Sequence, residues 1–212
     1  MQKYFINNNS EEIIIFFNGW GSDENPLKHL TSNKDALILS DYSDLKFDFD
    51  FSKYEKAYLI GYSAGVFMSS YLKDKLPKNA YKIAINGTQK FADEHFGLTK
   101  AVIKELEGLN LYNYLDFRRN YLVQDNKELI LFNKNQPKRT LESAREELNA
   151  LQNYYKERPQ EISFDKVLIS QNDKILNAEI QKKYWKNNFK IIENAAHFPF
   201  FRFKTYEEII KY

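Results

Sequence analysis

The chain of 212 residues contains no cysteine, and this absence removes several kinds of chemistry at once. Disulfides, thiolate metal sites and a cysteine nucleophile are excluded, so any nucleophile has to be a hydroxyl or a carboxylate. The absence also fits a reducing compartment. Histidine is scarce, with three residues in the whole chain, so a catalytic base has few candidates.

Long apolar runs are missing as well. The longest, residues 13–17, is far shorter than the roughly 20 residues that a membrane helix needs. The first residues have neither the apolar core nor the small-residue cleavage site of a signal peptide. The formal net charge of +2 gives no reason to expect nucleic acid as a partner. We therefore expect a cytoplasmic protein with no membrane partner, no nucleic-acid partner, no metal and no organic cofactor.

The composition that remains is that of an ordinary soluble domain, with 43% hydrophobic and 28% charged residues. A chain of this length buries about 70% of its unfolded surface, so we expect a single domain over residues 1–212. Short apolar strands alternate with helical stretches along much of it. This alternation predicts an α/β fold, a mostly parallel central sheet with helices on both faces. The predicted strands are residues 3–6, 13–17, 36–39, 58–61, 81–85, 166–170 and 190–192.

Residues 91–159 have a different character. Helical periodicity dominates over 98–109, 111–123 and 141–155, and only residues 129–132 have any strand character. We interpret this stretch as a helical cap inserted into the sheet domain. No pattern fixes the oligomeric state, and a monomer is our expectation.

Ser63 lies in the pattern Gly61-Tyr62-Ser63-Ala64-Gly65, between a short apolar strand and the start of an amphipathic helix. In such a G-x-S-x-G nucleophile elbow, the glycines leave room for the serine hydroxyl to project from the sheet. The helix over about 64–76 would aim its free amides at the same point. Three fixed positions also recur by chance, and a serine between glycines is often only a turn.

A base and an acid follow the serine in the chain. His197 lies in the small-residue loop after the last predicted strand, where an α/β-hydrolase has its histidine. Asp173 follows the strand before that one and would hold the imidazole in the correct tautomer. The order Ser63, Asp173, His197 is that of the α/β-hydrolase fold. The alternatives are a packed structural histidine and a turn aspartate. His29 and His95 lack this loop context, and Asp41 and Asp165 are wrongly placed to serve as the acid.

A serine hydrolase also needs donors for the oxyanion. The backbone amides of Ala64, after the nucleophile, and Trp20, after an early strand, occupy the expected positions. Asn18-Gly19-Trp20-Gly21 is equally consistent with a tight turn around a buried tryptophan.

Several segments together resemble a known family, the BioG-type pimeloyl-[acyl-carrier protein] methyl ester esterases, over essentially the whole chain. These segments are Phe16-Phe17-Asn18-Gly19-Trp20-Gly21, Gly61-Tyr62-Ser63-Ala64-Gly65-Val66, Asn86-Gly87-Thr88, Phe96-Gly97, Phe117-Arg118-Arg119, Ile169-Ser170-Gln171-Asn172-Asp173 and Ala195-Ala196-His197-Phe198-Pro199.

The resemblance implies hydrolysis of the methyl ester of pimeloyl-[acyl-carrier protein] in biotin synthesis, with acyl carrier protein as the partner. It also implies Ser63, His197 and Asp173 as the catalytic residues and Trp20 and Ala64 as the oxyanion donors. The substrate-binding residues would be Trp20, Ala64, Arg118 and Arg119. From residue spacing alone, only a serine hydrolase follows. A carboxylesterase or thioesterase acting on another short acyl chain, and a non-catalytic binding protein of the same fold, remain alternatives.

Basic residues in the predicted cap point to an acidic partner. The segment from Arg118 to Arg139 carries six basic residues against Asp125 and Glu128. If this patch grips the carrier, charge reversal at Arg118 and Arg119 should weaken turnover of a carrier-bound ester and spare a small one. The alternative is a solvated helix face. We expect the acyl chain to pass apolar residues such as Phe67, Leu115 and Tyr121.

Overall fold

The computed structural model describes residues 1–212 and is built around a seven-stranded sheet in the order β1-β3-β2-β4-β5-β6-β7. The strands are β1 (Gln2–Ile6), β2 (Glu12–Phe17), β3 (Asp35–Ser40), β4 (Lys56–Tyr62), β5 (Tyr81–Ile85), β6 (Lys166–Ser170) and β7 (Lys190–Ile192). Only β1 runs antiparallel to its neighbour, and all other pairs are parallel. The predicted α/β class with a mostly parallel sheet is therefore confirmed.

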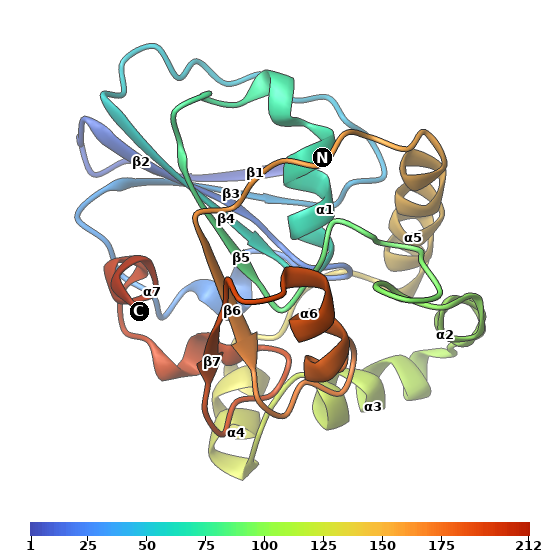
Figure 1. The fold of residues 1–212 in the computed structure, drawn as a ribbon. Helices are drawn as coiled ribbons and strands as arrows, with labels where there is room; N and C mark the ends of the chain where they lie inside the picture. The colour runs from blue at the N-terminus through green and yellow to red at the C-terminus, as the bar shows by residue number, and fades with distance from the viewer.

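Strand β2 shows why the early apolar run is continuous. Ile14 and Phe16 belong to the core on one face of the sheet, whereas Ile13, Ile15 and Phe17 belong to the core on the other. The first face is covered by the 3₁₀ helix Pro199–Arg202 and by α7 (Tyr206–Lys211). The second is covered by α1 (Ala64–Tyr71), α5 (Leu141–Lys156) and α6 (Ala178–Trp185) (Figure 1). A strand covered on both faces needs apolar residues at every position.

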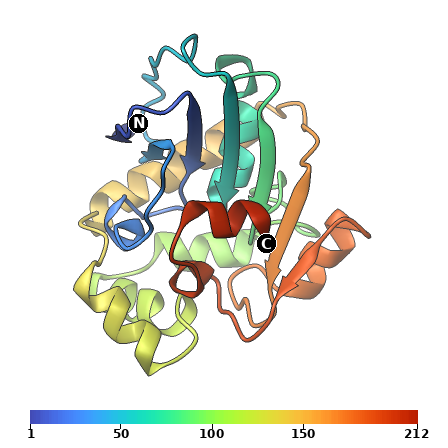
Figure 2. The ribbon, with the colours of Figure 1, turned by 90° about the vertical axis from the view of Figure 1, so that its left-hand side faces the viewer.

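Residues 86–165, between β5 and β6, form a helical insertion. It contains α2 (Lys100–Glu107), α3 (Leu111–Tyr121), α4 (Asn126–Lys134) and α5. Helices α2, α3 and α4 lie at one end of the sheet, beyond the C-terminal ends of the parallel strands (Figure 2). Ligands bind at the C-terminal ends of the strands in open α/β sheets. The insertion is therefore placed to cover whatever the strand ends present.

Two local expectations were wrong. Residues 129–132 are helical, because Asp125 caps α4 by accepting hydrogen bonds from the amides of Lys127 and Glu128. The helix after the elbow ends at Tyr71 and is followed by a short 3₁₀ turn, Lys73–Lys75. None of the helices combines the length and the apolar character that crossing a bilayer requires.

Candidate active site

Ser63 occupies a strained corner between β4 and α1. Its backbone has φ 54° and ψ −121°, a conformation that L residues rarely adopt. The flanking glycines are required by space, because a Cβ at Gly65 would lie 2.0 Å from the carbonyl oxygen of Phe17. A Cβ at Gly61 would lie 2.8 Å from the Cα of Val66. The chain therefore makes the tight strand-to-helix turn that exposes a nucleophile.

Three side chains from distant parts of the chain meet at this corner. His197 Nε2 lies 2.9 Å from Ser63 Oγ, and His197 Nδ1 lies 2.8 Å from Asp173 Oδ2. Asp173 Oδ1 accepts hydrogen bonds from the amides of Ile175 and Leu176. A carboxylate held in this way accepts the Nδ1 proton, which leaves the Nε2 lone pair facing the serine hydroxyl. The arrangement can remove a proton from Ser63.

Two buried side-chain amides that we did not assign to the site from the sequence hold the backbone of His197 and the carboxylate of Asp173 in place. Asn86 Nδ2 donates to the carbonyl oxygen of His197 at 2.7 Å, and Gln181 Nε2 donates to Asp173 Oδ2 at 3.0 Å. Asn86 belongs to the Asn-Gly turn after β5 and to one of the segments that carry the family resemblance, and these two signals pointed to it. Nothing in the sequence around Gln181, on α6, distinguishes it from a surface glutamine.

Two backbone amides beside Ser63 are free to stabilise negative charge. The N–H of Trp20 donates to no group of the protein, and Ala64 is the first residue of α1, whose own helix offers its amide no acceptor. Trp20, Ser63 and Ala64 line the same cavity. The indole of Trp20 packs edge-on against Tyr114 and Phe117, which keeps its loop against α3.

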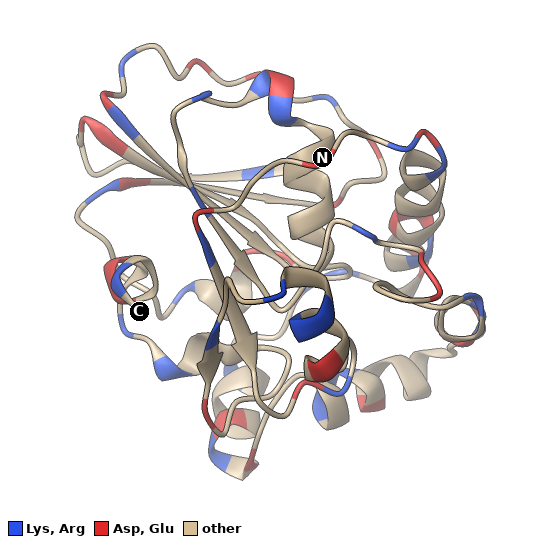
Figure 3. Ribbon diagram, viewed as in Figure 1, with Lys and Arg blue, Asp and Glu red and all other residues tan.

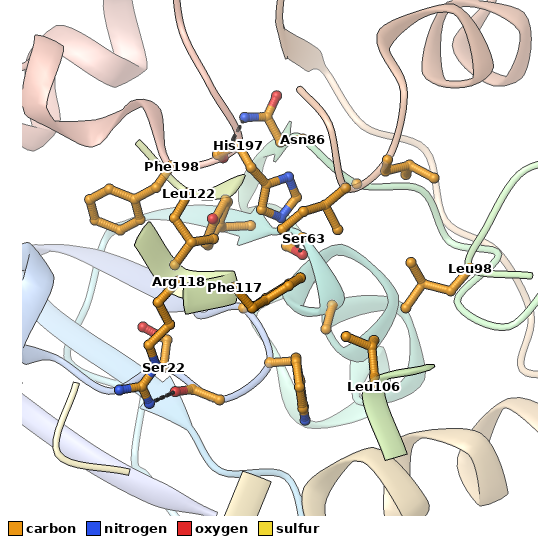
Figure 4. A pocket seen from close by; sticks show the side chains of 18 of the residues that line it. Ser22, Ser63, Asn86, Leu98, Leu106, Phe117, Arg118, Leu122, His197 and Phe198 are labelled. Atoms are coloured by element: carbon orange, nitrogen blue, oxygen red, sulfur yellow. Dashed lines mark hydrogen bonds between the residues drawn. The ribbon is translucent and has the colours of Figure 1, made fainter. Parts of the chain in front are cut away.

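The cavity above Ser63 is largely apolar. In Figure 4, the side chains of Leu98 and Leu106 lie on one side of Ser63 and those of Leu122 and Phe198 on the other. Its other apolar lining residues include Phe91, Phe117, Phe132, Pro137, Ile175 and Leu176. The cavity accommodates an aliphatic chain better than a charged group.

Of the three residues that we expected along the path of the acyl chain, Phe67 and Leu115 were wrong, whereas Tyr121 lines the outer groove described below. Phe67 lies in the core beneath Phe91, and neither Leu115 nor Tyr121 lines the cavity. On α3 the side chains that line the cavity are those of Tyr114, Phe117 and Arg118, at helical positions that the periodicity alone did not select.

A second groove continues outward between α2 and α3. It shares Leu106, Phe117 and Ile175 with the catalytic cavity. Farther out it is lined by Val102, Glu105, Leu109, Asn113, Asp116, Asn120, Tyr121 and Lys174. These three shared side chains therefore lie between the buried cavity and a groove with both polar and apolar walls.

The two neighbouring arginines of α3 have different surroundings. Arg118 is only 5% exposed, and its guanidinium donates to the carbonyl oxygens of Gly21, Pro137 and Arg139. Arg119 is exposed. The interpretation of Arg118 as a surface group for docking is therefore wrong, because its donors are already used inside the protein. Arg118 does line the cavity, with its charge held against backbone oxygens.

The rival residues lie elsewhere. His29 is held between the carbonyl oxygens of Pro26 and Phe200, and His95 is exposed. Asp41 forms an ion pair with Arg139 at 3.0 Å, and Asp165 accepts from the amide of Lys82. None of the four contacts Ser63 or His197.

The mostly parallel sheet, the elbow after β4 and the histidine loop after β7 define the α/β-hydrolase fold. An esterase from Exiguobacterium antarcticum has the same fold, with a TM-score of 0.69 at 14% identity over 99% of this chain and 94% of that one. The chain belongs to the BioG family: the family model described as "Pimeloyl-ACP methyl esterase BioG" matches residues 1–209.

Two relatives are more similar in sequence. The crystal structure of BioG from Haemophilus influenzae is 30% identical, with a TM-score of 0.85 over 98% of this chain and 99% of that one. A Bacteroides fragilis protein named malonyl-[acyl-carrier protein] O-methyltransferase is 33% identical over 195 residues, which make up 89% of this chain. The chain spans only 40% of the length of that relative.

Proposed function

We propose that the chain is a serine esterase that hydrolyses the methyl ester of pimeloyl-[acyl-carrier protein] in biotin synthesis, giving methanol and pimeloyl-[acyl-carrier protein]. The observation that carries the proposal is the contact of His197 with both Ser63 and Asp173, within a family of pimeloyl-ACP methyl esterases. A single chain over residues 1–212 does the chemistry, with the helical insertion acting as its cap.

Hydrolysis begins when Ser63 Oγ attacks the ester carbonyl carbon and passes its proton to His197 Nε2, 2.9 Å away. Asp173 stabilises the imidazolium through Nδ1. The amides of Trp20 and Ala64 donate to the oxyanion of the tetrahedral intermediate. His197 then gives its proton to the departing methoxide, so methanol leaves and an acyl-serine remains.

The second half of the reaction repeats these roles with water. His197 takes a proton from water, the resulting hydroxide adds to the acyl carbon, and Ser63 leaves with the proton from the imidazolium. The products are the free carboxylic acid end of the acyl chain and the regenerated serine. No step needs a group beyond the side chains and amides named.

The substrate carries two bonds that a serine hydrolase can attack, and the carrier thioester is the more activated one. The cavity and the outer groove offer a way to choose between them. An acyl chain entering past Leu106, Phe117 and Ile175 presents its far end to Ser63, while the thioester stays on the groove side. The selection is therefore by position.

Helix α4 offers a surface for the carrier. Lys127, Ile130, Leu131 and Lys134 follow the i, i+3, i+4, i+7 spacing of one helix face, and all four are exposed. Two lysines with exposed aliphatic side chains between them fit an acidic, amphipathic partner. Over the whole molecule, acidic and basic residues are interspersed, as Figure 3 shows, so this contact is local.

A carboxylesterase or thioesterase acting on another short acyl chain would use the same catalytic residues. The name of the Bacteroides relative describes a methyltransferase, but a serine in hydrogen-bond contact with a histidine favours hydrolysis for this chain.

The test is growth without biotin of a bacterial host that lacks its own pimeloyl ester esterase. The wild-type gene should restore growth, and the Ser63→Ala gene should not. In parallel, purified protein should turn over carrier-bound pimeloyl methyl ester more efficiently than free short-chain esters. Preference for the free esters, with no growth, would favour the general carboxylesterase.

A further inference from the structure

Glu147, on α5, is completely buried beneath the loops that follow β2 and β3. Its Oε2 accepts a hydrogen bond from the amide of Gly21 at 2.9 Å, and its Oε1 accepts one from the amide of Tyr42 at 3.1 Å. Gly21 follows β2 and Tyr42 follows β3. One carboxylate therefore ties together two loops at the edge of the sheet where Ser63 lies.

Gly21 is also held through its carbonyl group. Its carbonyl oxygen accepts from Arg118 Nη2 and from the Tyr114 hydroxyl, each at 3.3 Å. Gly21 has φ +66°, and a Cβ there would lie 2.7 Å from the Tyr114 hydroxyl oxygen. The Trp20 indole donates to the carbonyl oxygen of Ala144 at 2.5 Å. Helices α3 and α5 thus hold the Trp20–Gly21 segment, and the backbone N–H of Trp20 alone is left without an acceptor.

The charge of Glu147 has one direct counter-ion. Arg139 Nη1 lies 3.1 Å from its Oε2, while Arg139 Nη2 lies 3.0 Å from a carboxylate oxygen of Asp41. Burial raises the pKa of Glu147 to about 7, although Arg139 and the two amides lower it. The other titratable side chains around this cluster are Asp41, Tyr42, Tyr114 and Arg118.

A buried carboxylate costs free energy that an apolar residue of the same size would not. Glutamate is nevertheless suited to this position, because only a carboxylate presents two acceptor oxygens to two separate amides. A glutamine would serve one amide and turn its own N–H groups toward the other amide or toward Arg139.

We propose that Glu147 is a positioning residue for the oxyanion donor: by holding the Gly21 amide, it fixes the direction of the Trp20 N–H. Only the φ and ψ angles of Trp20 separate these two N–H groups, so holding one restricts the other. The inference rests on the proposed function, in which Trp20 donates to the oxyanion. Such donors are effective because they are oriented before the charge develops.

The experiment compares Glu147→Gln with Leu148→Ala in the full chain. Leu148 is the next residue of α5, is completely buried in the core and contacts neither loop amide through a hydrogen bond. Each variant is assayed with a small soluble ester. Each is also titrated with an alkyl trifluoromethyl ketone, whose adduct with Ser63 carries an oxyanion.

Glu147→Gln should lower kcat by at least about tenfold, with little change in KM. The loss should be smaller than the 10²- to 10³-fold cost of removing an oxyanion donor altogether. Its inhibition constant for the ketone should rise by a similar factor. Leu148→Ala should lower the melting temperature but leave kcat and the inhibition constant near wild type. A folded Glu147→Gln with wild-type kcat and ketone affinity would overturn the proposal.

Failure of the proposed function would look different. If the chain is not a serine hydrolase, wild-type protein will neither hydrolyse the small ester nor bind the ketone, whatever the residue at position 147. If it is an esterase for another acyl chain, wild-type protein will fail only on carrier-bound pimeloyl methyl ester, and the comparison of the two variants still holds. If Glu147→Gln does not fold, the amide nitrogen resonances of Gly21 and Tyr42 are followed by NMR in wild-type protein as the pH is varied. Both chemical shifts should change with pH around one common midpoint, because both amides donate to the same carboxylate. If the two resonances had different midpoints, Glu147 would not be the acceptor of the Gly21 amide, and the proposal would be overturned.

Discussion

The side-chain amide of Asn86 donates to the backbone carbonyl oxygen of His197 at 2.7 Å. The same nitrogen donates to Ser170 Oγ at 2.7 Å, and Asn86 Oδ1 accepts from the Ser170 amide at 2.7 Å. The end of β5 is thereby joined to the end of β6 and to the histidine loop. This buried amide therefore holds the backbone of the residue whose imidazole contacts Ser63.

Replacement of Asn86 by alanine should therefore lower both stability and activity. The substitution leaves buried hydrogen-bond partners unpaired, so the free energy of unfolding should fall by about 2–4 kcal/mol, as measured by urea unfolding. Displacement of the imidazole should lower kcat on a soluble ester by about 10- to 100-fold. The matched control is Ser170→Ala, which removes only the hydroxyl acceptor. A folded Asn86→Ala with wild-type kcat would show that the histidine loop holds its own position.

Asp173→Asn tests the role of the acid. The amide can donate to His197 Nδ1 and so stabilise the tautomer whose Nε2 carries the proton, which cannot accept one from Ser63. By analogy with other triads, kcat should fall by about 10⁴ with the fold retained. The control is Gln181→Leu, which removes one donor to Asp173 and should cost far less. If Asp173→Asn retained more than a tenth of the activity, the acid would have to be another residue.

Charge reversal on α4 tests carrier docking. The double variant Lys127→Glu, Lys134→Glu should lower kcat/KM for the carrier-bound ester, by weakening attraction of an acidic partner, while sparing a small soluble ester. Salt should reduce the difference between wild type and variant. Lys78→Glu, exposed at the opposite end of the sheet before β5, is the control and should change neither rate. Equal loss on both substrates would contradict docking through α4.

The pKa of Glu147 predicts how stability depends on pH. The folded-state pKa of about 7 lies above the ordinary 4.5, so the folded state binds more protons than the unfolded state between these values. Ionisation of Glu147 therefore lowers the free energy of unfolding as pH rises from about 5 to 7, by about 3 kcal/mol. Glu147→Gln cannot ionise and should lack this loss. Urea unfolding of both proteins at pH 5 and pH 8 checks it; parallel pH dependences would contradict the prediction.

The sequence predicted the parts of the fold that local patterns determine. The buried strands are recognisable because residues such as Ile13–Phe17 must be apolar on both faces, and the elbow because Gly61 and Gly65 have no room for a side chain. The pairing of β1 could not be predicted in this way, since β1 pairs with β3 and not with β2, the next strand in the sequence. The carboxylate of Asp35 holds the amides of Asn8 and Ser10 where the chain turns, a contact that no local pattern encodes.

The supporting residues of the site were missed for the same reason. Glu147 meets Gly21 across 126 positions of sequence, and Asn86 meets His197 across 111. Arg118 belongs to a basic run that looks exposed, yet it is buried because the loop carbonyls of Gly21, Pro137 and Arg139 gather around it. Such roles follow from tertiary contacts, which spacing along the chain does not reveal.

In the proposed function, Ser63 attacks the methyl ester at the far end of a carrier-bound chain. The most direct test incubates the protein with pimeloyl-[acyl-carrier protein] methyl ester and measures the mass of the carrier product together with the methanol released. We expect a carrier lighter by one methylene, with its thioester intact, an equal amount of methanol, and neither product with Ser63→Ala. Release of the whole acyl chain from the carrier, or product formation by Ser63→Ala, would contradict it.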